Sequence, residues 1–471
     1  MTITLRTTKG SQLTWDELDG NFTHLLNTSP VSASNTSLQD CLDAFPPGTT
    51  VRNGEIYIPS GTYTISSTIL SANSLSNYTI RGAGRGATVL QTSGLAGSPV
   101  FKLINPRNVT IRDLSIVGES GSRPSYGIQC DVVSPVTGSS APGSCTFRDI
   151  DIWYCDDGIA MTNDSGTFDN NNSENTIDNV FFETITNDGI AIRHSSSLDH
   201  AIANCVFSNC GRAAISNVPV TAGAGGSFTA YGNRSGGCAV ILRLNWSTHA
   251  LGASGWRSEN DTKILATPTG FSTNATRVSL TDFDSINASF GSPAIQFDAG
   301  ALSVLDLVSC NFSSIDLSFP TAGSTVSVFG GTWSTGTLTY ANTVNMYGHT
   351  ETAGAPTYTQ SGSGILKISN RTGTTNNEVF RNVTSGTSFI ATHGLNRPDC
   401  FTLSYAAPTT LTNITGGYDG QSILVVFDNA NATVSSLAGG TGQISLISTS
   451  TFSAGRDIKL TYRASNGVWY G

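Results

Sequence analysis

A segment between Val109 and Ser216 repeats one template four times, and this repetition restricts the possible folds more than any other feature. The sequences VTIRDLSIV, CTFRDIDIW, NTIDNVFFE and HAIANCVFS align, which puts four residues 25 to 36 positions apart in one register: Asp113, Asp149, Asn179 and Asn204. A second register carries glycines 31 residues apart, in Tyr126-Gly127-Ile128, Asp157-Gly158-Ile159 and Asp188-Gly189-Ile190. Ala214-Ile215 continues it. Imperfect repeats of this length are typical of a solenoid.

Apolar and polar residues alternate within each repeat, so alternate side chains should face opposite sides of a strand. The predicted inward rows are Leu114/Ile150/Val180/Cys205 and Ile116/Ile152/Phe182/Phe207. The predicted solvent-facing rows are Ser115/Asp151/Phe181/Val206 and Val117/Trp153/Glu183/Ser208. We therefore expect an all-β, right-handed parallel β-helix. A β-propeller is the alternative, but its repeats are longer and more regular.

The composition fits a turn-rich β protein, because only 12% of the 471 residues are charged and 50 are glycine. The net charge is −9 and no long basic run occurs, which argues against a nucleic-acid surface. The first residues lack the apolar stretch of a secretory signal, and no run of 18 apolar residues predicts membrane insertion. Nine cysteines without a CxxC pair are interpreted as buried free thiols. No metal-binding motif or cofactor is expected.

Residues 1–27 have the pattern of a separate helical segment. Thr14 and Glu17 form a capping box, and one helical face carries Leu18, Phe22, Leu25 and Leu26. So short a one-sided helix must dock on something else. The stretch LRTTKGSQLTWDELDGNFTHL resembles the N-terminal peptide of many bacteriophage tail fibre and tailspike proteins. That resemblance implies that residues 1–27 attach the protein to a phage tail or baseplate protein.

Residues 28–50 are predicted to be a linker and a cap for the β-helix, with a short helix carrying Leu38, Leu42 and Phe45. The β-helix itself is assigned to residues 51–340. Its entry, EIYIPSGTYTISSTIL, resembles that of pectate-lyase-like β-helices in phage tailspikes and polysaccharide-cleaving enzymes. The glycine-rich stretch from Gly82 to Gly86 is not a phosphate loop, because a strand rather than a helix follows it.

The coil pattern stops in the C-terminal part of the chain. Residues 341–370 are assigned to a transition and residues 371–471 to a small antiparallel β-sandwich. NITGGYDGQSILVVF and DIKLTYRASNGVWYG resemble modules at the ends of phage tail proteins, which assist trimer assembly or bind sugar. Exposed sheet faces and the Phe181/Val206 row also favour a homotrimer.

Carboxylates and aromatic residues on adjacent coils are the candidates for chemistry, because glycoside hydrolysis needs two carboxyl groups. We expect Glu183 and Asp157 to be the catalytic pair, with Asp188 assisting. The predicted substrate-binding residues are Trp153, Asp151, Arg212, His194, Trp246, His249 and Trp256. Repulsion between Asp157 and Asp188 should keep a proton on one of them, and Arg212 could orient the other. An alternative interpretation is that Asp-Gly only forms a turn, and that 246–263 is a packed loop or a subunit contact.

These observations favour a phage tailspike that recognises and cleaves a bacterial surface polysaccharide. It would be made in the host cytoplasm, reside in the virion tail and act outside the cell. The alternatives are a tail protein that binds glycan without cutting it, a structural tail component, and a polysaccharide lyase.

Overall fold

The structure is a computed structural model in which the chain divides into two compact units, Met1–Arg234 and Ser235–Gly471. It describes residues 28–30, 39, 54–70, 76–133, 142–162, 172–194, 197–217, 226–244, 250–267, 277–286, 290–297, 303–312, 316–319, 324–333, 337–341, 343–348, 350–351, 357–360, 365–369, 372–373, 380–383, 388–390, 399–415, 422–428, 430–434, 443–446, 450–451, 456–463 and 465–471. The predicted helix over residues 1–27 lies outside the described residues. No helix with the length and apolar character of a membrane span occurs in the described segments.

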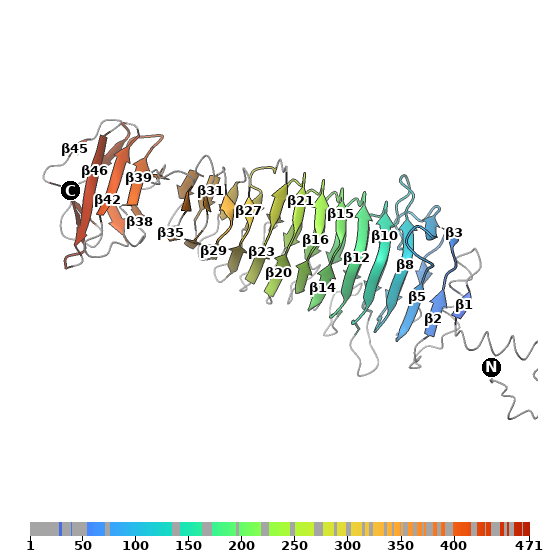
Figure 1. Ribbon diagram of the computed structural model, residues 1–471. Helices are drawn as coiled ribbons and strands as arrows, with labels where there is room; N and C mark the ends of the chain where they lie inside the picture. Colours follow the sequence, from blue (N-terminus) through green and yellow to red (C-terminus); the bar gives the residue numbers. More distant parts are fainter. Residues whose placement is uncertain are drawn as a thin grey trace, which may run out of the picture. The chain divides into compact units, whose positions relative to one another are not determined.

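The first unit consists of parallel coils that contribute strands to two sheets (Figure 1). Sheet A contains β1 (Thr28–Pro30), β2 (Gly54–Tyr57), β3 (Gly61–Ile65), β5 (Tyr78–Arg81), β6 (Thr88–Thr92), β8 (Thr110–Val117), β10 (Thr146–Trp153), β12 (Thr176–Glu183), β14 (His200–Ala203), β15 (Val206–Ser208) and β17 (Phe228–Tyr231). Sheet B contains β4 (Ile69–Leu70), β7 (Phe101–Ile104), β9 (Tyr126–Asp131), β11 (Asp157–Thr162), β13 (Asp188–Ile192) and β16 (Ala213–Asn217). This arrangement confirms the predicted right-handed parallel β-helix.

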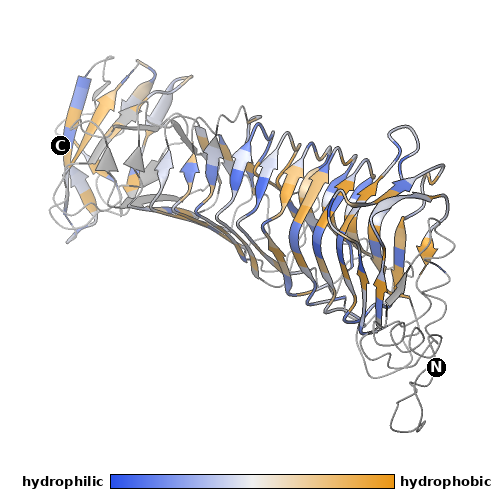
Figure 2. Cartoon of the chain, turned by 45° about the vertical axis from the view of Figure 1, so that its right-hand side comes forward, coloured by the Kyte–Doolittle hydropathy of each residue, from blue (hydrophilic) through white to orange (hydrophobic). Residues whose placement is uncertain are grey.

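The predicted inward rows form the interior of this unit. Ile150 pairs with Leu114 and Val180, and Ile152 pairs with Ile116 and Phe182. These side chains are buried, and the rings of Phe182 and Phe207 stack with centroids 4.9 Å apart. Figure 2 shows apolar and polar residues alternating along the strands of this unit. Apolar side chains at equivalent positions of successive coils therefore stack into a continuous core. The described elements are all strands.

The four aligned Asp and Asn residues share one backbone conformation. Asp113, Asp149, Asn179 and Asn204 have φ values of 60°, 54°, 52° and 53°, in the left-handed region. Asp and Asn tolerate this region better than other non-glycine residues, which explains why the template keeps them. The side chains also bond between coils, since Asn179 Nδ2 donates to Asp149 Oδ1 at 2.7 Å. Each coil bends at this position within sheet A.

Glycine at the second register is required by close packing rather than by a turn. Asp157 and Asp188 are the first residues of β11 and β13, so the interpretation of Asp-Gly as a turn is wrong. A Cβ on Gly158 would lie 2.5 Å from Phe182 Cδ1 and 2.4 Å from the Gly189 carbonyl oxygen. Because real Cβ atoms do not approach so closely, the large inward Phe182 selects glycine opposite it.

Within the predicted linker and cap, residues 28–50, the structure describes β1 and Gln39, and Gln39 bonds to an edge of sheet B. The Gln39 side-chain amide donates to the Leu70 carbonyl at 2.7 Å and accepts from the Leu70 N–H at 2.8 Å. It thereby satisfies backbone groups of β4 that an unpaired edge would leave open.

The second unit begins with coils of the same kind. After β18 (Arg234–Gly236) at the boundary, its strands are β19 (Leu242–Leu244), β20 (Ala250–Ser254), β21 (Arg257–Glu259), β22 (Leu265–Ala266), β23 (Arg277–Thr281), β24 (Asp284–Ile286), β25 (Ile295–Gln296), β26 (Val304–Val308), β27 (Asn311–Phe312), β28 (Leu317–Phe319), β29 (Thr325–Phe329), β30 (Thr332–Trp333), β31 (Thr337–Tyr340), β32 (Thr343–Tyr347), β33 (Thr350–Glu351), β34 (Thr357–Gln360), β35 (Ile365–Ser369) and β36 (Thr372–Gly373). Parallel pairing of β32 with β35 and of β33 with β36 extends through the segment 341–370, which the sequence assigned to a transition.

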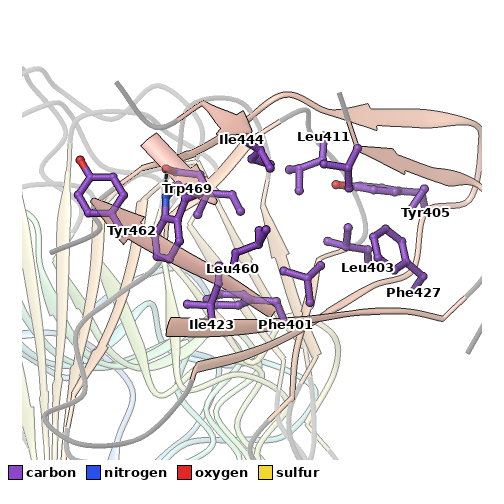
Figure 3. Packing of buried hydrophobic residues seen from close by; sticks show 14 residues of the cluster. Phe401, Leu403, Tyr405, Leu411, Ile423, Phe427, Ile444, Leu460, Tyr462 and Trp469 are labelled. Atoms are coloured by element: carbon purple, nitrogen blue, oxygen red, sulfur yellow. Dashed lines mark hydrogen bonds between the residues drawn. The ribbon is translucent and has the colours of Figure 1, made fainter. Parts of the chain in front are cut away.

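The C-terminal strands pack around their own apolar core (Figure 3). They are β37 (Phe380–Val383), β38 (Ser388–Ile390), β39 (Asp399–Leu403), β40 (Thr409–Leu411), β41 (Asn413–Thr415), β42 (Ser422–Phe427), β43 (Ala432–Val434), β44 (Ile444–Ser445), β45 (Ser450–Thr451), β46 (Arg456–Arg463) and β47 (Val468–Tyr470). The Trp469 indole donates to the Ile414 carbonyl at 2.7 Å. β42 pairs antiparallel with β46 but parallel with β39, so the predicted antiparallel sheet is in fact mixed.

Candidate functional site

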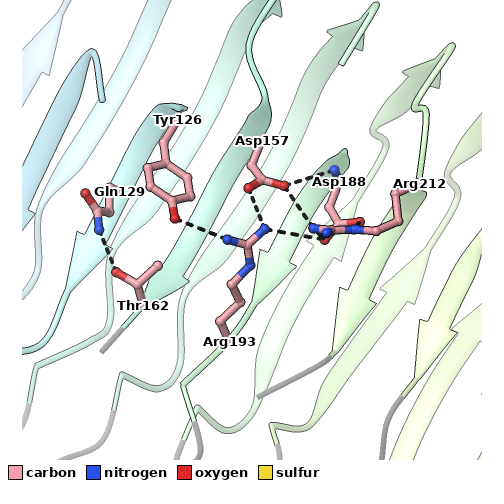
Figure 4. A network of polar contacts seen from close by, with 7 residues as sticks. All are labelled: Tyr126, Gln129, Asp157, Thr162, Asp188, Arg193 and Arg212. Carbon is pink, nitrogen blue, oxygen red and sulfur yellow. Dashed lines mark hydrogen bonds and ion pairs between the residues drawn. The ribbon is translucent and has the colours of Figure 1, made fainter. Parts of the chain in front are cut away.

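A network of charged side chains lies at the start of the sheet B strands (Figure 4). Register pairing puts Asp157 opposite Tyr126, and hydrogen bonding links Asp157 to Asp188 on the next coil. Arg193 follows β13, and Arg212 precedes β16. We call Asp157, Asp188, Arg193 and Arg212 the quartet.

The guanidinium groups connect both carboxylates. Arg212 binds Asp188 at two points, with Nε 2.8 Å from Oδ1 and Nη2 2.5 Å from Oδ2. Its Nη2 also lies 3.4 Å from Asp157 Oδ1. Arg193 Nη2 donates to Asp157 Oδ2 at 2.5 Å, and its Nη1 donates to the Tyr126 hydroxyl at 3.1 Å. Two positive and two negative groups thus balance within one cluster.

The two carboxylates differ in how they are held. Burial raises the pKa of Asp157 to about 6, against the lowering effect of Arg193, and the charge of Asp188 raises it further. The hydrogen bond with Asp188 raises the pKa of Arg212. Arg212 contacts both carboxylates rather than one, with two hydrogen bonds to Asp188 and a longer contact to Asp157.

The quartet is enclosed. The side chains of Asp157 and Asp188 are 3% and 1% exposed, whereas Arg193 and Arg212 are 22% and 36% exposed. A ligand approaching the quartet would therefore meet the guanidinium groups before either carboxylate. Asp157 can hold and release a proton in this arrangement.

Glu183 and Trp153 lie elsewhere, at the ends of β12 and β10 on the outer face of sheet A. They are direct neighbours in register, between Val117 and Ser208. Both side chains are half-buried. The Glu183 carboxylate forms no hydrogen bond or ion pair with the residues that the structure describes, and the buried Trp153 indole N–H likewise has no described partner. An aromatic ring and an unpaired acid therefore lie side by side.

A corner separates Glu183 from Asp157, since the two belong to different sheets. Arg123 covers this corner: it lies over the Tyr154 ring at 5.7 Å and donates to the Thr184 carbonyl at 2.8 Å. The structure thus joins Asp157 to Asp188 and Arg212, and joins Glu183 to Trp153.

Asp151 was predicted to face solvent, but the structure buries its side chain. It is 9% exposed, because Arg85 from the loop before β6 binds Oδ1 and Ser115 Oγ donates to Oδ2 at 3.0 Å. Ser115 is buried as well, so half of the predicted Ser115/Asp151/Phe181/Val206 row is covered. The rest of the row, Phe181 and Val206, is half-buried.

His194, also predicted to bind substrate, is buried in the structure. Its side chain is fully buried, and burial lowers its pKa to about 4. Nearby, the buried His200 ring shares a 2.7 Å hydrogen bond with Ser197 Oγ. Neither ring is available to a large substrate.

Trp256 belongs to the core of the second unit. It is fully buried, stacks on Phe283 with centroids 6.4 Å apart, and donates its indole N–H to Ser235 Oγ at 2.8 Å. Asp261 is also buried and accepts hydrogen bonds from Ser235, Ser258 and the Cys238 N–H. The predicted excursion over 246–263 is in part a regular coil carrying β20 and β21. Trp246 and His249 lie outside the described residues.

Sequence reasoning did not select Tyr126, Arg193 or Arg85. For Tyr126 a signal existed, because the glycine register aligns it with Asp157 and Asp188. The reach of Arg193 and Arg85 across coils had no such signal, since it depends on loop and side-chain paths. The seven cysteines whose side chains the structure describes, in contrast, are buried free thiols as predicted. Within the described residues, no group of three or more potential ligand side chains could hold a metal ion.

Comparison with known proteins gives a family model that matches part of the chain, within the first unit. The family model "Rhamnogalacturonase A/epimerase, pectate lyase-like" matches residues 31–223. No curated protein sequence matches the chain. Similarity to solved structures shows the fold of the chain and assigns no activity to it.

Three solved structures illustrate these likenesses. The catalytic unit of the GH87 α-1,3-glucanase from Streptomyces thermodiastaticus strain HF3-3 is 12% identical, with a TM-score of 0.44 over 71% of this chain and 64% of that one. The Agl-KA catalytic domain is 12% identical, with a TM-score of 0.49 over 79% and 65%. The N-terminal fragment of bacteriophage phi29 gene product 12 is 14% identical, with a TM-score of 0.45 over 83% and 85%. The chain spans slightly less than two thirds of the first two.

Proposed function

We propose that this protein is a phage tail component that binds a bacterial surface polysaccharide and cleaves it. The N-terminal sequence resemblance to tail proteins supports the location, with residues 1–27 as the attachment to the tail or baseplate. The match of residues 31–223 to a family named for rhamnogalacturonase and epimerase supports a polysaccharide as the ligand.

The observation that carries the proposal is the pairing of Trp153 with Glu183 on the outer face of sheet A. Aromatic faces stack on the apolar faces of sugar rings, and a carboxylate can donate a proton to a glycosidic oxygen. Glu183 has no described partner that would compete for its carboxylate. In this proposal Trp153 and Phe181 hold sugar rings and Glu183 is the proton donor.

The second carboxyl group is proposed to be Asp157, with Asp188 assisting. Its raised pKa suits proton transfer near neutral pH, while Arg212 holds Asp188 in place. Because Asp157 is enclosed, the substrate would have to displace Arg193 or Arg212 to reach it.

The test is incubation of purified protein with polysaccharide isolated from the host surface, followed by measurement of chain length and of new reducing ends. Glu183→Gln should retain binding and lower turnover by about 10²-fold or more. Asp178→Asn, at the other end of β12, is the matched control and should cleave at the wild-type rate. Wild-type cleavage by both Glu183→Gln and Asp157→Asn would exclude this site. Unsaturated sugar ends among the products would identify a lyase.

A glycan-binding tail protein without catalysis is the second candidate. The enclosure and complete ion pairing of Asp157 and Asp188 favour it, because a reacting carboxylate must touch its substrate. Polysaccharide that binds but stays intact would decide for this candidate.

We further propose a homotrimer. In the second unit, Phe329 and Tyr347 are 41% and 39% exposed and stack with centroids 5.2 Å apart, an apolar surface that a second copy could cover. Light scattering that gives a monomer mass at micromolar concentration would contradict this. Deletion of residues 1–27 should leave a folded, glycan-binding protein that no longer enters virions.

A further inference from the structure

The loop between β5 and β6, residues 82–87, lies on the outer face of sheet A. The Gly84 N–H donates to the Asp113 carbonyl at 2.9 Å, and the Gly86 N–H donates to Ser115 Oγ at 2.9 Å. Both acceptors belong to β8 on the next coil. We call residues 82–87 the strap.

Arg85 extends the strap across two more coils. Its Nε lies 2.8 Å from Asp151 Oδ1 on β10, and its Nη1 donates to Asn179 Oδ1 on β12 at 3.3 Å. Arg112, also on this sheet, pairs with the adjacent Asp113 of its own strand at 3.1 Å. Arg85 therefore contacts strands of other coils, whereas Arg112 contacts its own strand. The Arg85 side chain remains 34% exposed.

The strap divides one outward row into a covered part and an open part. Ser115 and Asp151 beneath it are 4% and 9% exposed, whereas Phe181 and Val206, next in the same row, remain half-buried. The Arg85 guanidinium lies at the boundary between the covered and the open part of the row, where it contacts β10 and β12. Strand β12 also carries Phe181 and Glu183. A long ligand crossing the coils along this row would meet the guanidinium group there.

We propose that Arg85 is a specificity-determining residue that ends the glycan path at β10, so that one end of the bound sugar chain stops against its guanidinium group. The inference rests on the proposed binding of polysaccharide to this face. Guanidinium N–H groups that remain exposed can donate hydrogen bonds to the hydroxyl groups of the last sugar. Removal of the side chain would extend the path over Asp151, by one coil spacing of about 4.8 Å, while the strap backbone still covers Ser115 through the Gly86 N–H.

The experiment measures affinity for size-graded oligosaccharides prepared from the host polysaccharide, using the full chain. For the wild type, affinity should stop increasing at a definite oligosaccharide length. Arg85→Ala should shift this limit to longer oligosaccharides, and Arg85→Lys should restore part of the limit. Arg112→Ala is the matched control, because its ion pair lies outside the strap, and it should leave the limit unchanged.

The outcomes separate this inference from the proposed function. Absence of binding by the wild type at every length would overturn both. Binding with the same length limit in wild type and in folded Arg85→Ala would overturn the role of Arg85 alone. If Arg85→Ala does not fold, Asp151→Asn, which weakens the hold on the guanidinium group, replaces it. An unchanged limit in that variant would again contradict the inference.

Discussion

The first unit carries carboxylates at two places, Asp157 and Asp188 on sheet B and Glu183 on sheet A, and their surroundings make them chemically different groups. Asp157 and Asp188 on sheet B are buried and neutralised by two arginines. Glu183 on the outer face of sheet A is half-buried beside Trp153 and has no described partner. A repeated fold thus uses a carboxylate either in a buried ion pair or as an accessible acid, depending on which side chains from neighbouring coils reach it.

The largest loss of stability should come from breaking the buried ion pair between Arg212 and Asp188. Arg212→Ala leaves the Asp188 carboxylate, 1% exposed, without its two-point partner. We expect the free energy of unfolding to fall by about 3 kcal/mol, the lower end for a broken buried pair, since Arg212 is itself partly exposed. Urea unfolding followed by circular dichroism measures the change.

The control for this prediction is Arg112→Ala. Arg112 and Asp113 are both 28% exposed, and an exposed pair contributes about 1 kcal/mol or less. Equal losses in the two variants would show that burial does not distinguish the quartet from a surface ion pair.

Ionisation of Asp157 should lower the free energy of unfolding by a similar amount as the pH rises. Its pKa is about 6 in the folded protein and 3.8 in the reference state, so the folded state binds the proton more tightly. The corresponding stabilisation is present below about pH 3.8 and is lost as the pH rises through 6, by about 3 kcal/mol.

Comparison of the wild type with Asp157→Asn isolates this contribution. The stability difference between the two proteins should change between pH 4 and pH 6 and be constant at higher pH. Buried His194 and His200, whose pKa values are lowered to about 4, act in the opposite direction in both proteins and cancel in the difference. A difference that is independent of pH would show that Asp157 is not held in a desolvated site.

A smaller effect tests the packing behind the quartet. Gly158→Ala puts a Cβ against Phe182 and the Gly189 carbonyl, and overpacking of this kind costs about 1–3 kcal/mol. Gly121→Ala is the control, because nothing lies within 4 Å of its added Cβ. Thermal melts should show a lower transition temperature for Gly158→Ala only.

Much of the fold was predictable because it depends on local, repeating constraints. The aligned Asp113, Asp149, Asn179 and Asn204 report a backbone conformation, and the alternating rows report which face is inward. Each of these can be inferred from one repeat and checked against the next. The alternative that Asp-Gly only forms a turn was wrong because packing against Phe182 also selects glycine, and the sequence alone does not separate the two causes.

The site was harder to predict because it depends on contacts between coils. Register alone aligned Trp153 with Glu183, and Asp157 with Tyr126. It did not predict that Arg85 covers Asp151, or that Trp256 packs inward on Phe283, because those contacts depend on loop paths and on side-chain directions outside the aligned repeats. The burial of His194 was likewise not predictable from the repeat pattern, because it depends on residues that pack against it from elsewhere in the chain.

The smallest effect on stability should come from the accessible side of the comparison. Glu183→Gln keeps the size of the side chain and removes a carboxylate that no described residue binds, so the free energy of unfolding should change by less than about 0.5 kcal/mol. Asp188→Asn, by contrast, weakens two contacts to Arg212 and should lower stability measurably. Denaturant midpoints of the two variants, measured together with polysaccharide affinity, test the distinction directly. If Glu183→Gln destabilises the protein as much as Asp188→Asn does, then Glu183 has a structural role, and the face beside Trp153 loses its claim to be the site of proton transfer.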